Sequence, residues 1–235
     1  MNGRLYGVGV GPGDPELMTL KAVRLIQENH VVAFPGTVPQ ETIAYRIAIQ
    51  AVPELAQKEL VPIPMPMTHD RQEMEANHQR GARLLESYLE QGKNVLFLTL
   101  GDPSIYSTFT YVQRIVEQHG YSTAMVSGIP SFCAAAASIN TPLVQWNEQL
   151  HVIPGVHSLK EELPVSGNYV LMKSGKKMKQ VKDILAARKR TVIMVENASM
   201  EHEHIYRGLE EIPDDAGYYS LMIAKESPID SDTQK

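Results

Sequence analysis

The sequence predicts an α/β protein with a mostly parallel sheet, and two observations carry that prediction. Short apolar runs of strand length alternate along the chain with amphipathic, charged runs of helical length. Glycine and proline close several of the apolar runs, as expected where a strand ends in a loop. The chain has 235 residues, of which 43% are hydrophobic, so it can bury a substantial core without disulfides or metals.

The N-terminal half gives the clearest elements. Asn94 to Leu100 is apolar on both sides, which is typical of a central strand in a parallel sheet. Alternating prolines exclude a helix over Val61 to Met67. We expect a helix that Asp14 caps, with Pro15 in its first turn. Its buried face is expected to carry Leu17, Leu20 and Val23. Further strands are expected over 5–10, 30–34 and 121–126, and further helices over 43–49, 71–90 and 105–118.

The C-terminal half continues in the same style. Strands are expected over 149–153, 169–172, 191–195 and 218–224, and helices over 131–139, 177–188 and 200–209. We place a boundary near Gly128, which predicts domains of residues 1–128 and 129–235. The last ten residues, 226–235, are polar and are expected to fray.

Composition narrows the class of protein. The single cysteine, Cys133, excludes an internal disulfide and a thiolate zinc site, which suits a reducing compartment. No apolar run approaches the roughly 18 residues that span a bilayer. The N-terminus has no basic segment followed by an apolar stretch, so we expect no signal peptide. A formal net charge of −5 argues against a dedicated nucleic-acid binder. We therefore expect a cytoplasmic enzyme.

The first predicted strand ends in the glycine-rich loop Gly7 to Gly13. The dinucleotide fingerprint needs glycines at relative positions one, three and six. From Gly7 or Gly9, the sixth position is Pro12 or Asp14, so the fingerprint is not matched. Pro12 also lacks the backbone N–H that a phosphate would accept from. Two interpretations stay open, namely a tight turn and a loop that lets a ligand approach the backbone.

Gly101-Asp102-Pro103 lies at the carboxyl end of the predicted central strand, where α/β proteins bind ligands. A residue before proline is extended, so the Asp102 carboxylate would be held at a defined angle. Taken alone, the motif favours a turn or a helix-cap role for Asp102.

Together these loops resemble the tetrapyrrole methylases, the S-adenosylmethionine-dependent enzymes of the cobalamin and sirohaem pathways. The resemblance rests on Gly9 to Ala22, Leu100 to Pro103 and Gly128 to Ser131, in the family's order and spacing. It covers nearly the whole chain. It implies two α/β domains with a mostly parallel N-terminal sheet and a mixed C-terminal sheet. It also implies that S-adenosylmethionine lies in the cleft between the domains, and that the chain forms a homodimer.

Four further segments are similar to the branch of the family that methylates carbon-20 of precorrin-2 or cobalt-precorrin-2 in cobalamin biosynthesis. They are Leu100 to Thr108, Gly128 to Ala137, Leu171 to Gly175 and Val195 to Ala198. The resemblance implies a methyltransferase with a tetrapyrrole substrate and no protein-bound metal, any cobalt being carried by the substrate. It implies neither nucleic acid nor membrane as a partner.

Three alternatives stay open. One is another tetrapyrrole methylase, acting on uroporphyrinogen-III or on a later corrin intermediate. The others come from different classes, an RNA-modifying methylase and a nucleotide-binding module without methyl transfer. Cofactor affinity separates the module from the enzymes, and a steep salt dependence of RNA retention would support the RNA enzyme.

The resemblance also implies cofactor contacts. Pro12 matches the floor of the first loop, Asp102 is expected near the methionine or ribose polar groups, and Met172 and Ala198 match backbone contacts to adenine. The third loop departs from the family, since many relatives carry threonine and alanine there. The full set is Pro12, Leu100, Gly101, Asp102, Ile105, Pro130, Ser131, Met172, Ala198 and Tyr219.

The sulfonium methyl group of the cofactor is already activated, so positioning is expected to supply most of the catalysis. Tyr106, Tyr218 and Tyr219 are candidate general bases by residue type, although a pKa of about 10 must shift for a tyrosine to act so. Tyr219 falls where many members have a proline on the last strand. That departure makes it, with Tyr218, a candidate for contact with substrate.

Other polar clusters have ordinary interpretations beside the functional ones. Eight basic residues and one acidic residue, Asp183, lie between positions 173 and 190. This segment is interpreted either as a solvated helix face or as a surface that attracts a polycarboxylate substrate. On the expected helix, the histidines of Glu201 to His204 would not converge on a metal. Cys133 is expected to be a small core residue. Ordinary polar roles are expected for His69, His78, His151 and His157.

Overall fold

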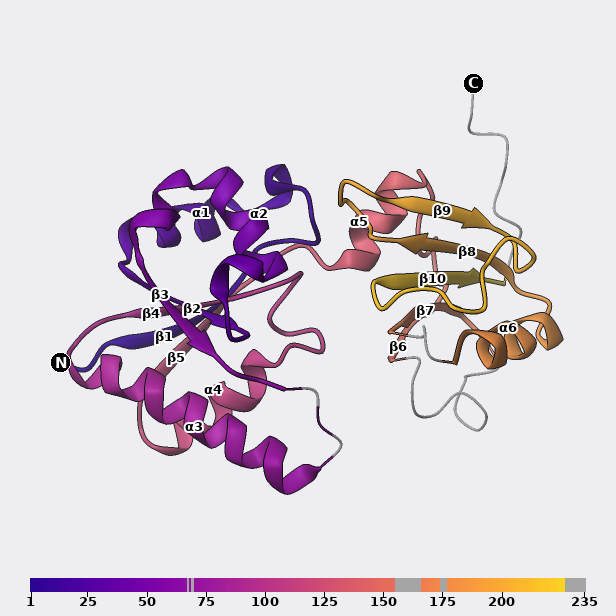
Figure 1. Ribbon diagram of the computed structural model, residues 1–235. Helices are drawn as coiled ribbons and strands as arrows, with labels where there is room; N and C mark the ends of the chain where they lie inside the picture. Colours follow the sequence, from indigo (N-terminus) through magenta and orange to yellow (C-terminus); the bar gives the residue numbers. More distant parts are fainter. Residues whose placement is uncertain (67, 69, 155–165, 174–176, 227–235) are drawn as a thin grey trace. The chain divides into compact units, whose positions relative to one another are not determined.

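The computed structural model describes residues 1–66, 68, 70–154, 166–173 and 177–226, and the chain divides into two compact units, Met1–Pro130 and Ser131–Lys235 (Figure 1). Four residues with expected roles lie outside the described residues, namely His69, His157, Lys176 and Gly175. The expected fraying of the C-terminus also falls there, except at Glu226. No helix among the described residues has the length and apolar character needed to cross a membrane.

The first unit is built on a parallel sheet of five strands in the order β3-β2-β4-β1-β5. The strands are β1 (Arg4–Gly9), β2 (Val31–Pro35), β3 (Glu59–Ile63), β4 (Val95–Thr99) and β5 (Ser122–Val126). Every residue of β4 is buried at the centre of the sheet, which confirms the prediction for Asn94 to Leu100. Strand β3 was not predicted; its Pro62 is tolerated because β3 is an edge strand.

Two helical layers cover the two faces of this sheet (Figure 1). Side chains alternate along β4, so Leu96 and Leu98 join the core beneath α1 and α2, while Val95 and Phe97 join the core beneath α3 and α4. The helices are α1 (Leu20–Glu28), α2 (Ile43–Ala51), α3 (Arg71–Glu90) and α4 (Phe109–Gln118), with short 3-10 turns η1 (Pro15–Leu17), η2 (Pro39–Glu41) and η3 (Pro53–Gln57).

The helix expected after Asp14 is split in two. Asp14 accepts a hydrogen bond from the Glu16 N–H and caps only η1. Helix α1 starts later, where the Thr19 hydroxyl accepts from the Ala22 N–H. Because the split rotates the helix, Leu20 is 88% exposed, and its predicted place on the buried face is wrong.

The second unit carries a mixed sheet of five strands in the order β6-β7-β10-β8-β9. Strands β6 and β7 are parallel, whereas β10 runs antiparallel to both β7 and β8. The strands are β6 (Leu150–Pro154), β7 (Asn168–Met172), β8 (Thr191–Glu196), β9 (His204–Arg207) and β10 (Ser220–Lys225), and the helices are α5 (Ser131–Ser138) and α6 (Met178–Ala187). Helix α6 packs on one face, and α5 contacts β10. The expected fold class is confirmed in both units.

Four sequence predictions are wrong in detail. The helix expected over 200–209 is replaced by β9, because residues 204–207 pair with β8. Helix α4 starts at Phe109 rather than at Ile105, since Tyr106 adopts a left-handed φ of 48°. Strand β10 starts at Ser220, so Tyr218 and Tyr219 lie in the preceding turn. Cys133 is exposed and does not belong to the core.

Part of the basic segment supports the second sheet. The wholly buried Tyr169 has a hydroxyl that accepts from Arg190 at 2.9 Å and from Arg188 at 3.2 Å. Arg190 also donates to the Gly167 carbonyl and pairs with Glu226 at 3.0 Å. The solvated helix face expected for the segment is therefore wrong for Arg190, whose side chain is 4% exposed and whose bonds join the start of β7 to Glu226 after β10.

Replacing Tyr169 with Phe should lower the free energy of unfolding by about 1–3 kcal/mol, because two guanidinium groups lose a buried acceptor. Denaturant unfolding measures the loss. Tyr121→Phe is the matched control, since that hydroxyl bonds Glu90 at the exposed surface and its removal should change little. Equal stability of both variants would contradict a structural role for the Tyr169 hydroxyl.

Candidate functional site

Three loops meet at the carboxyl edge of the first sheet. They follow β1, β4 and β5, three strands that are neighbours in the sheet. The loop after β1 bonds the loop after β4 through a pair of backbone hydrogen bonds between Gly11 and Gly101, with N···O distances of 3.3 and 2.8 Å. Both glycines have left-handed φ angles, 79° and 71°, which other residues rarely adopt. The motifs, which are far apart in the sequence, therefore lie together in one cluster.

The loops approach so closely that side chains are excluded between them. A Cβ atom on Gly9 would lie 2.5 Å from the Gly101 carbonyl oxygen and 2.7 Å from the Gly128 nitrogen. A Cβ on Gly128 would overlap the same carbonyl. Gly9 and Gly128 are thus required for backbone packing, and Gly101 is required for its left-handed φ of 71°, so the glycine-rich loops have a structural role.

Asp102 joins the loop after β4 to the loop after β5. Its Oδ2 accepts from the Gly128 N–H at 3.0 Å, and its Oδ1 accepts from the Ser104 N–H at 2.8 Å and from the Ser104 hydroxyl. The side chain is 9% exposed. Both oxygens are therefore engaged within the protein, so the turn-forming interpretation of Asp102 holds. The Oδ2 oxygen keeps a further lone pair for a ligand, whereas Oδ1 already accepts two hydrogen bonds from Ser104.

Ser107 continues the loop after β4 into α4. Its hydroxyl lies 3.0 Å from the Thr99 hydroxyl and accepts from the Phe109 N–H at 3.2 Å. The left-handed Tyr106 stands just before it and is 45% exposed. Sequence reasoning missed Ser107, because a serine eight residues beyond the end of β4 carries no distinctive pattern.

The remaining predicted cofactor residues of this unit surround the loops. Pro12 is buried between two glycines, and Leu100 and Ile105 are half-buried. A Cβ on Gly101 would meet only the Ile129 carbonyl oxygen, at 3.9 Å, so the space directly beside this glycine is not closely packed. Pro130 ends the first unit and Ser131 begins α5 of the second, both of them half-buried.

The second unit gathers its predicted residues at one edge of its sheet. Met172 ends β7, Ala198 follows the end of β8, and Tyr218 and Tyr219 precede β10. Because β10 is antiparallel to both strands, its start lies beside their ends, and the Asn197 N–H donates to the Tyr219 carbonyl at 3.1 Å. Tyr218 and Tyr219 therefore lie near Met172 and Ala198, whereas Tyr106 belongs to the first unit.

Glu196 fixes the turn that carries the two tyrosines. Its Oε1 accepts from the Gly217 N–H at 2.8 Å, and its Oε2 accepts from the Tyr206 hydroxyl at 3.4 Å. The Ser220 hydroxyl closes the turn onto the Gly217 carbonyl at 2.7 Å. Sequence reasoning gave Glu196 no role, although it lies inside one of the motifs that carry the resemblance.

The Tyr219 hydroxyl is a poor candidate for a general base. Burial, followed by the neighbouring Tyr218, raises its pKa above the usual value near 10. At neutral pH the hydroxyl keeps its proton and can donate a hydrogen bond. The two rings meet edge to face, with centroids 5.2 Å apart and an interplanar angle of 87°.

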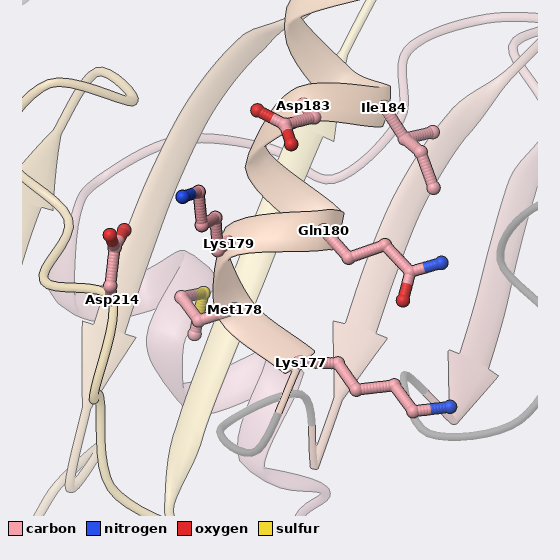
Figure 2. A pocket seen from close by; sticks show the side chains of 7 residues that line it. All are labelled: Lys177, Met178, Lys179, Gln180, Asp183, Ile184 and Asp214. Atoms are coloured by element: carbon pink, nitrogen blue, oxygen red, sulfur yellow. The ribbon is translucent and has the colours of Figure 1, made fainter.

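The basic segment also lines a surface pocket of about 470 Å³ at the start of α6 (Figure 2). Figure 2 shows Lys179 and Asp214 on one side of the helix, and Lys177 and Gln180 on the other. Lys182 donates to Asp214 at 2.9 Å, and that bond and its charge lower the Asp214 pKa. Because Asp183 and Asp214 share the pocket, its charge is mixed.

The histidines form no candidate metal centre in the part of the chain that the structure describes, where no three His, Cys, Asp or Glu side chains gather closely enough. His204 lies on β9 rather than on the expected helix. His78 is buried and stacks on Tyr111 with ring centroids 4.9 Å apart. Burial lowers the pKa of His78.

Comparisons with known proteins find relatives that match the chain over nearly its whole length. The chain is 32% identical over 227 residues to a protein of Methanocaldococcus jannaschii named probable cobalt-precorrin-2 C(20)-methyltransferase, covering 94% of this chain and 96% of the relative. It is 31% identical over 232 residues to the cobalt-precorrin-2 C(20)-methyltransferase of Salmonella typhimurium, covering 95% and 96%.

The fold is shared with solved structures. A uroporphyrin-III C-methyltransferase of Thermus thermophilus, in complex with S-adenosyl homocysteine, superposes with a TM-score of 0.70 at 24% identity, covering 95% of this chain and 92% of that one. The family model described as Tetrapyrrole (Corrin/Porphyrin) Methylases matches residues 4–213. The chain therefore belongs to the tetrapyrrole methylases.

Proposed function

We propose that this chain transfers a methyl group from S-adenosylmethionine to carbon-20 of precorrin-2 or cobalt-precorrin-2. The observation that carries the proposal is the end-to-end similarity to two relatives from distant organisms that are both named for this reaction. The relatives' own lengths are covered almost fully, so the similarity spans both units of the chain.

The glycine-loop cluster suits S-adenosylmethionine better than a dinucleotide. Pro12 offers no N–H to a phosphate, so the loop lacks one of the backbone donors that a dinucleotide would use. The proposed contacts in the first unit are Pro12, Leu100, Gly101, Asp102 and Ile105. At the junction and in the second unit they are Pro130, Ser131, Met172, Ala198 and Tyr219.

The cofactor supplies an activated methyl group, which an electron-rich carbon of the tetrapyrrole attacks as the sulfur leaves uncharged. The task of the chain is then to align two bound reactants, which can contribute roughly 7–11 kcal/mol in well-oriented systems. Rigid loops suit that task, and the glycine contacts and the Asp102 bonds hold these loops together. Among the candidate tyrosines, Tyr219 serves as a hydrogen-bond donor to substrate.

The proposal extends to a homodimer in the cytoplasm, with no metal bound by the protein and with any cobalt carried by the substrate. Similarity to uroporphyrinogen-III C-methyltransferases is weaker, at 30% identity over 163 residues of the Bacillus subtilis protein, which covers 68% of this chain. That enzyme class is therefore the second candidate.

Anaerobic incubation with S-adenosylmethionine and precorrin-2, with and without cobalt, tests the function. Mass spectrometry with fragment mapping should find one added methyl group at carbon-20. Tight cofactor binding without methylation of precorrin-2 would redirect the assignment to uroporphyrinogen-III or to a later corrin intermediate. Absence of cofactor binding would contradict the proposal.

Replacing Asp102 with Ala should weaken S-adenosylmethionine binding by about tenfold or more and lower stability by about 1–3 kcal/mol, because the buried Gly128 N–H loses its acceptor. Calorimetric titration and denaturant unfolding measure the two effects. Asp70→Ala is the matched control, since Asp70 also accepts two backbone N–H groups, at the start of α3 beyond the edge strand β3. It should lose stability while keeping affinity. Unchanged affinity in Asp102→Ala would remove Asp102 from the site.

Replacing Tyr219 with Phe should leave the shape of the kcat profile unchanged between about pH 6 and 9, because the raised pKa keeps the hydroxyl protonated throughout. The loss in kcat should stay below the hundredfold typical of a missing general base. Tyr88→Phe is the control, since its pKa is also raised and its hydroxyl bonds Glu59 on β3. A larger loss, accompanied by disappearance of a basic limb, would assign Tyr219 as the base.

A further inference from the structure

A lysine and two tyrosines form a cluster in the second sheet, where β7 ends and β10 begins. Tyr218 is 51% exposed and Tyr219 is 41% exposed, although both are large aromatic residues. The Lys173 ammonium lies 5.9 Å from the centroid of the Tyr218 ring, within range of a cation–π contact. We call Lys173, Tyr218 and Tyr219 the lysine–tyrosine platform.

The backbone beneath the platform is held in an uncommon conformation. Lys173 has a left-handed φ of 60°. Asn197 and Ser199, which follow β8, are also left-handed, with φ angles of 53° and 62°. Such residues persist only where the surrounding structure fixes them, and they gather at ligand sites. Glu196 holds the turn with Tyr218 and Tyr219 from below through the Gly217 N–H. Hydrogen bonds to neighbouring segments therefore hold the backbone that carries the two tyrosines.

The chemistry of the platform matches one class of ligand. An ammonium group pairs with carboxylates, and the Tyr219 hydroxyl adds a neutral donor beside it. Tyrosine rings present flat apolar surface together with a polar tip. A flat macrocycle with carboxylate side chains offers the complementary groups.

We propose that Lys173, Tyr218 and Tyr219 bind the tetrapyrrole substrate, Lys173 pairing with a peripheral carboxylate while the tyrosines contact the macrocycle. The inference rests on the proposed function only in requiring a polycarboxylate tetrapyrrole as substrate. Lys173 then determines affinity for substrate and has no part in affinity for S-adenosylmethionine.

Binding of uroporphyrin, a stable porphyrin polycarboxylate, tests the platform through quenching of its fluorescence. Lys173→Gln should weaken uroporphyrin binding by about tenfold, as expected for the loss of one charge-assisted hydrogen bond. Lys173→Arg keeps the charge and should bind within about twofold to threefold of the unmodified chain. The difference between Lys173→Gln and the unmodified chain should shrink as NaCl rises, because salt screens exposed charges.

Lys189→Gln is the matched control. Lys189 is exposed whereas Lys173 is half-buried, but Lys189 is also left-handed, with φ 53°, and its substitution removes the same charge. Lys189 precedes β8, and the start of β8 and the end of β7 lie at opposite ends of the strand β10 that separates them. Affinity for uroporphyrin should be unchanged in this variant, and S-adenosyl homocysteine should bind equally to all variants.

Equal uroporphyrin affinity of Lys173→Gln and Lys189→Gln would overturn the platform, and so would a parallel loss of S-adenosyl homocysteine binding in Lys173→Gln. The proposed function has a separate readout, because methylation of precorrin-2 is measured on the unmodified chain. A chain that binds uroporphyrin through Lys173 but leaves precorrin-2 unmethylated would support the platform and contradict the carbon-20 assignment.

Discussion

The close backbone contact among Gly9, Gly101 and Gly128 is the constraint on which the candidate site depends. Three neighbouring parallel strands bring their loops to one edge, and the loops touch because no side chain stands between them. Asp102 then spans the gap that remains by accepting the Gly128 N–H. A larger residue at Gly9 or Gly128 would separate the loops, so the geometry offered to a ligand follows from the packing of main chain on main chain.

In the second unit, different interactions hold the segments where β7 and β8 end and β10 begins. Its sheet is mixed, so the start of β10 lies beside the ends of β7 and β8. Glu196 receives the Gly217 N–H and fixes the turn before β10, and three non-glycine residues nearby adopt left-handed backbone. In each unit, the loops that carry the candidate residues are thus held by hydrogen bonds within that unit.

The basic segment separates into residues with different tasks. Arg188 and Arg190 bond the buried Tyr169 hydroxyl, and Lys182 pairs with Asp214, so these charges serve the fold. Lys177 and Lys179 line an open pocket that also holds Asp183 and Asp214. Long-range attraction of a polycarboxylate would therefore come from part of the segment only, and Lys173 lies beside the exposed ring of Tyr218.

The sequence by itself determined the α/β class, the central strand β4, and the motifs that mark the glycine loops, because apolar runs and glycine–proline punctuation are local signals. It also made Tyr218 and Tyr219 candidates for contact with substrate, because Tyr219 stands where many members of the family have a proline. Tertiary structure alone decided that residues 204–207 form a strand, since pairing with β8 outweighs their local pattern. It also decided that Leu20 faces solvent, that Asp102 bonds Gly128, and that Lys173 lies beside Tyr218. The contacts of Asp102 with Gly128 and of Lys173 with Tyr218 join segments far apart in the chain, and no local pattern encodes them.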